Sequence, residues 1–323
     1  MSSPAKLASL VVACAASAQA QIWEKLPSLP EPNGGFACAA WEGKIAVVGG
    51  TNWEGDEKRW LTVVHVFDPA EPAWTLLKPL IQPIAHPVIS STSAGLVVVG
   101  GTTGQAPFLS SVSVTRGETT ARSGPSISRA TVGAAGGAIG GEFILVGGTD
   151  DIANIAQLRS GAFAWDFRSG KERTLPDYPG GALGLAASVT TEDELFIFGG
   201  ATWDSAAKQV VNRDDAWAFS VRRNQWRRLH ALPAGVRAMS AVRLDTHRFY
   251  LAGGFESNGV GFTDHAWIYH IAEDRYVPAR ALPYRAYVGL VESAGYVYCL
   301  GGEDRGKHRT DEVYRAKVAD LLK

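Results

Sequence analysis

The sequence predicts an all-β protein, a six-bladed β-propeller, and three observations support this prediction. Six of its double glycines each close a short apolar run, as in IAVVGG and FILVGG. The intervals between them are 51, 47, 52, 54 and 48 residues, so the chain consists of repeats of nearly constant length. Turn signals such as Glu42-Gly43 and Asp68-Pro69 divide the repeats into short segments of strand length. The first glycines of the six pairs are Gly49, Gly100, Gly147, Gly199, Gly253 and Gly301.

The repeat length also indicates the type of blade. About fifty residues form one four-stranded blade of the kelch type. We expect the glycines where the buried strand ends, in a turn where Cβ atoms would clash. The fourth repeat shows the pattern most clearly, with strands predicted over 182–189, 195–198 and 215–221 and a fourth that opens at Gln225-Trp226.

The two ends of the chain predict how the ring closes. Residues Trp23 to Pro27 have the character of an outer strand, although no earlier strands precede them. The last repeat has strands near Val288, Tyr296 and Val313 but no fourth strand after them. We therefore expect the N-terminal strand to complete the sixth blade and to cover an edge that would otherwise be exposed. Residues 21–323 then form one propeller domain.

Composition excludes one class of partner. Aliphatic, aromatic and cysteine residues make up 46 % of the chain, with ten tryptophans, which is enough for a large core. The formal net charge is −1, whereas nucleic-acid-binding proteins usually carry a basic face. We therefore expect no nucleic-acid partner, while a protein partner is not excluded.

The N-terminus predicts export. Lys6 precedes an apolar stretch from Leu7 to Ala16, and Ala18-Gln19-Ala20 has the small-x-small pattern of a cleavage site. Residues 1–20 would be a signal peptide cleaved after Ala20, with no transmembrane segment because the apolar run is too short. A lipoprotein anchored at Cys14 is the alternative. Both interpretations place the protein in the periplasm or outside the cell.

The remaining cysteines and the histidines give no metal or cofactor signature. Cys38 and Cys299 fall in predicted inner strands of neighbouring blades, where they are either small buried hydrophobic residues or a disulfide pair. The seven histidines are scattered, and His265 and His270 would lie on opposite faces of a strand. We expect neither a metal nor a cofactor, and a copper oxidase is disfavoured.

Three arginines suggest an anionic ligand. Arg129, Arg237 and Arg285 precede the first glycine of their blades by 18, 16 and 16 residues, where the chain leads into the first strand. Each could simply bond the next blade. Together around one opening they would form a positive funnel for a carboxylate. The loops after the glycine pairs, which include Asn52 and Trp53, mix amides and indoles in a way that suits a sugar.

The last and first blades carry a specific resemblance. The motifs are Pro283-Tyr284-Arg285-Ala286-Tyr287-Val288-Gly289, Gly301-Gly302-Glu303 and Arg309-Thr310-Asp311, together with Gly34-Gly35-Phe36-Ala37, Gly49 to Trp53 and Lys58-Arg59-Trp60. The chain resembles the kelch-type N-acetylneuraminate epimerases, which are sialic acid mutarotases, and within them a circularly permuted branch. One departure is Gly181-Ala182, where some members have an arginine after Pro-Gly-Gly.

The resemblance implies a cofactor-independent isomerase acting on a small anionic sugar. Glu303 would be the base and Arg309 would hold the sugar's carboxylate or stabilise developing charge. Arg285, Arg237 and Arg129 would orient the anion, and Asn52, Trp53 and Tyr287 would line the pocket. The alternative is a non-catalytic kelch propeller that binds a glycan or a protein, because this fold supports many functions.

Overall fold

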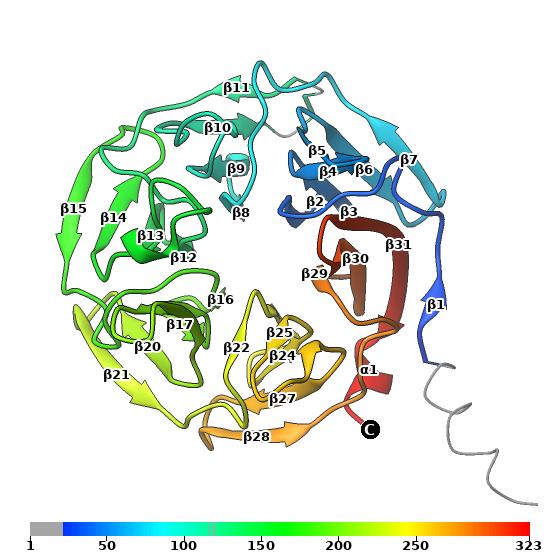
Figure 1. The fold of residues 1–323 in the computed structure, drawn as a ribbon. Helices are drawn as coiled ribbons and strands as arrows, with labels where there is room; N and C mark the ends of the chain where they lie inside the picture. Colours follow the sequence, from blue (N-terminus) through cyan, green and yellow to red (C-terminus); the bar gives the residue numbers. More distant parts are fainter. Residues whose placement is uncertain (1–21, 116, 119) are drawn as a thin grey trace, which may run out of the picture.

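The fold is a six-bladed β-propeller. The computed structural model describes residues 22–323 except 116 and 119, and within them six four-stranded antiparallel sheets are arranged radially around a central opening (Figure 1). The predicted signal peptide and the alternative lipidation site at Cys14 lie outside the described residues. No helix in the described part of the chain is both long and apolar enough to cross a membrane.

Each blade has its innermost strand at the opening and its outermost strand at the rim. The first three blades consist of β2 (Ala37–Trp41), β3 (Lys44–Val48), β6 (Val64–Asp68) and β7 (Ala73–Leu76); β8 (Val88–Thr92), β9 (Gly95–Val99), β10 (Ser111–Val114) and β11 (Arg122–Ser123); and β12 (Ala135–Ile139), β13 (Glu142–Val146), β14 (Ala162–Asp166) and β15 (Glu172–Leu175).

The other three blades have the same order, and blade 6 takes its outer strand from the N-terminus. They consist of β16 (Ala187–Thr190), β17 (Glu194–Phe198), β20 (Ala216–Ser220) and β21 (Gln225–Leu229); β23 (Ser240–Arg243), β24 (Arg248–Ala252), β27 (Ala266–His270) and β28 (Arg275–Pro278); and β29 (Tyr287–Ser293), β30 (Tyr296–Arg305), β31 (His308–Lys317) and β1 (Glu24–Lys25).

Short additional elements decorate this frame. Hairpins β4 (Thr51–Glu54) with β5 (Glu57–Trp60) and β18 (Ala201–Asp204) with β19 (Gln209–Asn212) follow glycine pairs, and β22 (Val236–Arg237), β25 (Phe255–Glu256) and β26 (Gly261–Phe262) form a small sheet in blade 5. The helical segments are η1 (Ile155–Gln157) and α1 (Val318–Leu321).

The predicted strands of the fourth repeat are confirmed with one correction. The first strand begins at Ala187 instead of Ala182, because Leu185 has a left-handed φ of 53° that interrupts extended backbone. The core lies between neighbouring blades. For example, Phe196 of blade 4 stacks edge to face on Phe249 of blade 5 at a ring distance of 5.0 Å, an arrangement that adds to the energy of apolar burial.

Glycine is required at the pairs for two physical reasons. All twelve glycines of the six pairs have positive φ, between 42° and 111°. In addition, a Cβ on Gly49 would lie 2.0 Å from the Ile84 carbonyl oxygen of the next blade, and one on Gly302 would lie 2.0 Å from the Tyr287 carbonyl oxygen. The pairs therefore mark the points where the backbone of one segment closely approaches another.

The N-terminal strand closes the sixth blade, as the sequence predicts. Glu24 pairs with Arg315 and Lys25 with Tyr314 in an antiparallel register. The adjacent Trp23 is 6 % exposed, and its indole donates a 2.8 Å hydrogen bond to the Ala281 carbonyl oxygen in the segment between blades 5 and 6. The N-terminal segment therefore contacts the last blade through the pairing of β1 with β31 and the segment before that blade through Trp23.

Replacing Trp23 by alanine tests this closure. We expect a loss of about 3–5 kcal/mol in the free energy of unfolding, because a large buried side chain is removed at the junction. Urea denaturation followed by circular dichroism measures the effect. Lys25→Ala, two residues farther along the chain but solvent-exposed, is the control and should leave the midpoint nearly unchanged. Equal midpoints for wild type and Trp23→Ala would contradict the anchoring role.

Candidate functional site

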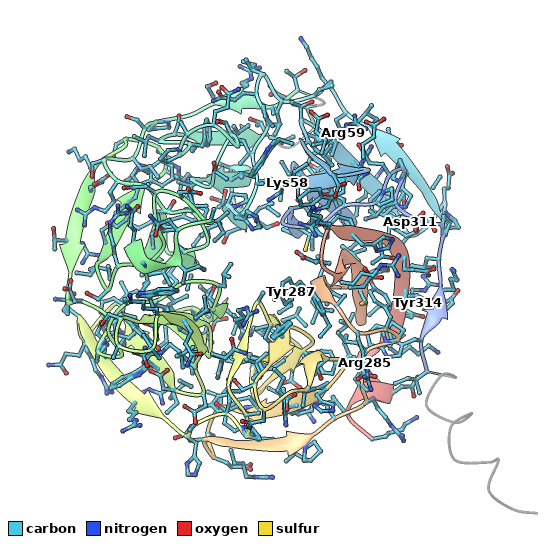
Figure 2. All side chains as sticks on the ribbon, viewed as in Figure 1. Lys58, Arg59, Arg285, Tyr287, Asp311 and Tyr314 are labelled. Atoms are coloured by element: carbon cyan, nitrogen blue, oxygen red, sulfur yellow. The ribbon has the colours of Figure 1, made fainter. Side chains whose placement is uncertain are left out.

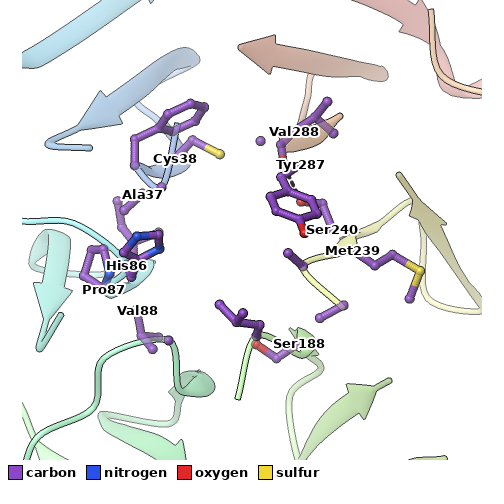
Figure 3. Close-up of a pocket in the computed structure, with 18 of the residues that line it drawn as sticks. Ala37, Cys38, His86, Pro87, Val88, Ser188, Met239, Ser240, Tyr287 and Val288 are labelled. Atoms are coloured by element: carbon purple, nitrogen blue, oxygen red, sulfur yellow. Dashed lines mark hydrogen bonds between the residues drawn. The ribbon is translucent and has the colours of Figure 1, made fainter. Parts of the chain in front are cut away.

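A cavity of about 530 Å³ occupies the centre of the ring and is lined by residues from all six blades. Figure 3 shows His86 and Tyr287 on opposite sides of this space, with Ser188 and Ser240 on its wall. Both serines are engaged in holding blades together: Ser188 donates to the Gly136 carbonyl oxygen at 2.9 Å and Ser240 to that of Val288 at 2.5 Å. The side-chain polar groups of the wall that remain are those of Lys58, His86, Tyr287, Glu303 and Arg309.

A circular series of hydrogen bonds surrounds the cavity in blades 1 to 5. Each of these blades contributes one residue with left-handed φ, and in blades 2 to 5 that residue donates its backbone N–H to the carbonyl of its counterpart in the preceding blade, at 2.7 to 3.1 Å. The participating residues are Gly35, His86, Gly133, Leu185 and Ala238. Within the described residues the series stops at Ala238. Blade 6 differs because β29 has a register shift between Tyr287 and Gly289, and Tyr287 pairs with Glu303 instead.

Blade 6 also carries the charged part of the cavity wall. Strands β30 and β31 continue past Gly301-Gly302 as a hairpin, with Glu303 on one strand and Arg309 on the other. The two side chains form an ion pair, with Arg309 Nη1 2.8 Å from Glu303 Oε2. The Arg309 side chain is only 4 % exposed, whereas that of Glu303 is 25 % exposed and can meet a ligand.

Arg309 lies at the junction between blade 6 and blade 1. Its Nε donates to Thr51 Oγ1 at 3.4 Å, and Nη1 also donates to the His308 carbonyl oxygen at 3.2 Å. Gly34 of blade 1 makes room for it, because a Cβ there would lie 2.4 Å from Arg309 Cδ. The guanidinium is thus held by both blades, and Nε and Nη1 already have protein partners.

Burial and charge act in opposite directions on Glu303. Desolvation raises the pKa of Glu303 above its ordinary value, although the Arg309 and Lys58 cations act to lower it. For Arg309, desolvation also disfavours the charged form and so lowers the pKa, while the negative charge of Glu303 opposes that shift. A carboxylate whose pKa is raised by burial is a stronger base than an exposed one, which is the property a general base needs.

His86 is a neutral group on the opposite side. Desolvation, with smaller contributions from the Lys58 and Arg309 charges, lowers the pKa of His86 to about 3. The imidazole packs against Gly35, where a Cβ would lie 2.6 Å from His86 Cε1. At neutral pH it therefore offers one hydrogen-bond donor and one acceptor without charge.

Tyr287 provides an aromatic surface and a hydroxyl. Its ring packs on Phe262 at a centroid distance of 4.9 Å, and burial raises the pKa of the phenol while Arg237 opposes the rise. Arg237 lies behind this wall, where it stacks on Phe255 at 4.1 Å and donates to Asn212 Oδ1 at 2.7 Å.

The structure brings together three of the eight predicted site residues on the cavity wall, namely Glu303, Arg309 and Tyr287. Asn52 and Trp53 are half-buried on β4 outside the lining. Arg129 stacks on Phe163 at 4.6 Å, and Arg285 is exposed and 3.4 Å from Asp264. Figure 2 shows Lys58 and Tyr287 near the opening and Arg285 farther out.

The sequence predicts that Arg129, Arg237 and Arg285 occupy comparable positions in their blades, and the structure corrects this prediction. Arg237 pairs with Phe255, and the residue of blade 3 in the matching position is Val132, which pairs with Thr149. Arg129 precedes Val132 in an irregular segment, so the two arginines do not occupy the same place in their blades. None of the three lines the cavity, and the expected funnel of arginines does not form there.

Lys58 and His86 also line the cavity, and neither was predicted from the sequence as a site residue. His86 lies in the segment leading into its blade's first strand, and its left-handed φ of 54° could not be inferred from that position. Lys58 is opposite Trp53 in the β4–β5 hairpin, where Gly55-Asp56 signals a turn.

Cys38 and Cys299 are free thiols, so the structure favours the small-hydrophobic interpretation over a disulfide. Burial raises the pKa of each thiol to about 12. Among the described residues, no three His, Cys, Asp or Glu side chains are grouped so that they could hold a metal ion.

The chain contains a kelch motif. Residues 32–81 match the family model described as "Kelch motif". The chain is also similar to proteins named N-acetylneuraminate epimerase. Those of Salmonella enteritidis PT4 and Salmonella typhi are 24 % and 23 % identical to it over 175 residues, which cover 44 % of this chain and 46 % of each relative. The alignment thus spans less than half the length of these curated relatives.

The neutral state of His86 can be tested through stability. Because the pKa of His86 is lower in the folded state than the ordinary value of about 6.5, unfolding takes up a proton below that pH, and stability falls as the pH falls towards 3. His86→Asn, which tolerates the left-handed backbone, should show a weaker decline between pH 6.5 and 4. Urea midpoints measure it, with the exposed His247→Asn as control. Parallel curves for wild type and His86→Asn would contradict the assignment.

Proposed function

We propose that this protein is an exported mutarotase that interconverts the anomers of N-acetylneuraminate or a related acidic sugar. The observation that supports it most is the Glu303–Arg309 ion pair on the wall of the central cavity. The similarity to proteins named N-acetylneuraminate epimerase supports the substrate class. Export, through a signal peptide at residues 1–20, is part of the same proposal.

The reaction requires only proton transfers. A base removes the proton from the anomeric hydroxyl, the bond between the anomeric carbon and the ring oxygen breaks, and a water molecule gives a proton to the ring oxygen. The resulting keto form rotates and closes on its other face, and each proton returns to the group from which it came. Atoms and charge balance without a cofactor, and a positioned acid–base group accelerates such steps by roughly 10²–10⁴-fold.

Glu303 acts as the base in this proposal. Its carboxylate is partly exposed to the cavity, whereas its ion-pair partner is buried, so a sugar hydroxyl can approach the carboxylate. The raised pKa of Glu303 increases its proton affinity relative to an ordinary surface glutamate. The proton taken from the anomeric oxygen is returned to the sugar when the ring closes again.

Arg309 stabilises charge in this proposal and does not grip the sugar's carboxylate through two nitrogens. A bidentate grip needs two adjacent guanidinium nitrogens, either Nε with Nη2 or Nη1 with Nη2. Nε already contacts Thr51, and Nη1 already contacts Glu303 and His308. The buried guanidinium orients Glu303 and lowers the energy of negative charge that develops on the anomeric oxygen.

The other predicted residues take lesser parts. Tyr287 lines the pocket and presents a ring to the sugar's C–H face. Arg237 supports Tyr287 from behind. Asn52 and Trp53 belong to the hairpin that also carries Lys58 of the cavity wall, and Arg129 and Arg285 have no part in this proposal because they lie outside the lining.

Glu303→Gln should reduce the rate of anomer exchange by about 10²–10⁴-fold, because the base is removed while shape is kept. Exchange between the anomers of N-acetylneuraminate is measured by proton NMR and corrected for the uncatalysed rate. The matched control is Asp150→Asn. Asp150 also forms an ion pair with an arginine, Arg159 at 2.6 Å, but this pair is solvent-exposed and outside the cavity lining, and the variant should retain the wild-type rate.

Equal acceleration by wild type and Glu303→Gln would exclude Glu303 as the base. A folded wild-type protein that binds glycans saturably without accelerating exchange would favour the non-catalytic propeller instead.

The pH dependence of catalysis provides a separate test. The base must be ionised, so the catalysed kcat/KM should fall as the pH falls through the pKa of Glu303. Because burial raises that pKa, the midpoint should lie above the ordinary value of about 4.3. The residual activity of Glu303→Gln should lack this acidic limb. A midpoint below the ordinary value would mean that the cations outweigh burial.

A further inference from the structure

The charge balance of the cavity wall singles out one residue. Apart from Lys58, the titratable groups on the wall are Glu303, Arg309, His86, Tyr287 and Cys38. The first two form an ion pair whose charges cancel. Burial keeps the other three neutral, because it lowers the pKa of His86 and raises the pKa values of Tyr287 and Cys38. The net charge of +1 that remains belongs to Lys58.

The surroundings of Lys58 leave its ammonium group available to a ligand. Nζ lies 4.4 Å from the centre of the Trp60 ring, a cation–π contact. In the described part of the chain, no hydrogen bond or salt bridge joins Lys58 to a carboxylate. Desolvation and the Arg309 charge lower the pKa of Lys58 and outweigh the opposing charges of Glu303 and Asp151, so an approaching anion would stabilise the charged form of Lys58.

The hairpin that carries Lys58 contacts neighbouring segments on two sides. On one side Asp56 forms a 2.8 Å ion pair with Lys307 of the β30–β31 hairpin. On the other side Trp60 packs over Gly104 of blade 2, where a Cβ would lie 2.4 Å from the indole. Side chains alternate along a strand, so Lys58 lies on the cavity wall while the neighbouring Arg59 is exposed and 3.7 Å from Glu54.

We infer that Lys58 binds the carboxylate of the acidic sugar and determines the preference of the cavity for an anion. The inference rests on the proposed function for the identity of the ligand. It completes the division of roles in the pocket, since Arg309 is committed to Glu303 and to blade 1. A desolvated ammonium that meets a carboxylate forms a charge-assisted hydrogen bond, the strong class of such bonds.

A cycle of two proteins and two ligands tests this inference. The ligands are N-acetylneuraminate and its methyl ester, which keeps the sugar but removes the charge, and the proteins are wild type and Lys58→Met. Isothermal titration calorimetry measures the dissociation constants, and anomer exchange is followed separately by NMR. Arg59→Met removes a cation from the same hairpin outside the lining and is the matched control.

The expected result is a selective loss. Lys58→Met should weaken binding of the acid by about 10–100-fold, the size of a hydrogen bond to a charged group. It should leave the ester almost unaffected, so the preference of wild type for the acid disappears in the variant. Arg59→Met should bind both ligands as wild type does, and Lys58→Arg should recover part of the affinity for the acid.

The outcomes separate the two proposals. Equal loss for acid and ester, or no loss for either, overturns the role of Lys58 whether or not exchange is catalysed. Lys58-dependent binding of the acid without acceleration of exchange overturns the mutarotase proposal and retains the carboxylate site. Absence of binding of either ligand to wild type overturns both.

Discussion

In five of the six blades of the described chain, a hydrogen bond from the second glycine of the pair reaches the next blade, and the propeller depends on this constraint. Gly50, Gly148, Gly200 and Gly254 each donate N–H to a carbonyl in the segment that leads into the following blade, and Gly302 donates to Asn33 at 2.7 Å and so joins the last blade to the first. Positive φ and the absence of Cβ permit that approach. Once these contacts fix the spacing of the blades, the inner strands enclose a cavity of defined width.

The charged side chains of the cavity wall are concentrated where this regular pattern is broken. The circular hydrogen bonds around the cavity run from Gly35 to Ala238, and blade 6 replaces the next member with a shifted register at Tyr287. Its two long strands extend beyond the glycines and bring Glu303 and Arg309 to the wall. Five blades thus provide mostly small and apolar lining, and the sixth, together with the hairpin of blade 1, provides the charges.

Much of the fold could be predicted because its determinants are local. An apolar run followed by two glycines identifies each buried strand, and the lone outer strand at Trp23 revealed how the ring closes. Glu303 and Arg309 were singled out by the resemblance of the last blade to a known family, and the structure places both in the single hairpin that follows Gly301-Gly302. The arginines could not be aligned by counting back from the glycines, since Arg129 and Arg237 lie in segments of different conformation.

Lys58 was missed because its place on the wall depends on contacts of its hairpin with Lys307 and Gly104, which are distant in sequence.

The location of Arg309 between two blades links chemistry to the order of assembly. Its partners Thr51 and Gly34, and the ammonium of Lys58, come from the beginning of the described chain, whereas Glu303 and Arg309 come from the end. An intermediate with most blades formed but the ring still open would hold nearly all its secondary structure and yet lack this constellation. Under the proposed function, ligand recognition therefore requires the closed ring, and loss of binding would report an open toroid even where the strand content measured by circular dichroism is unchanged.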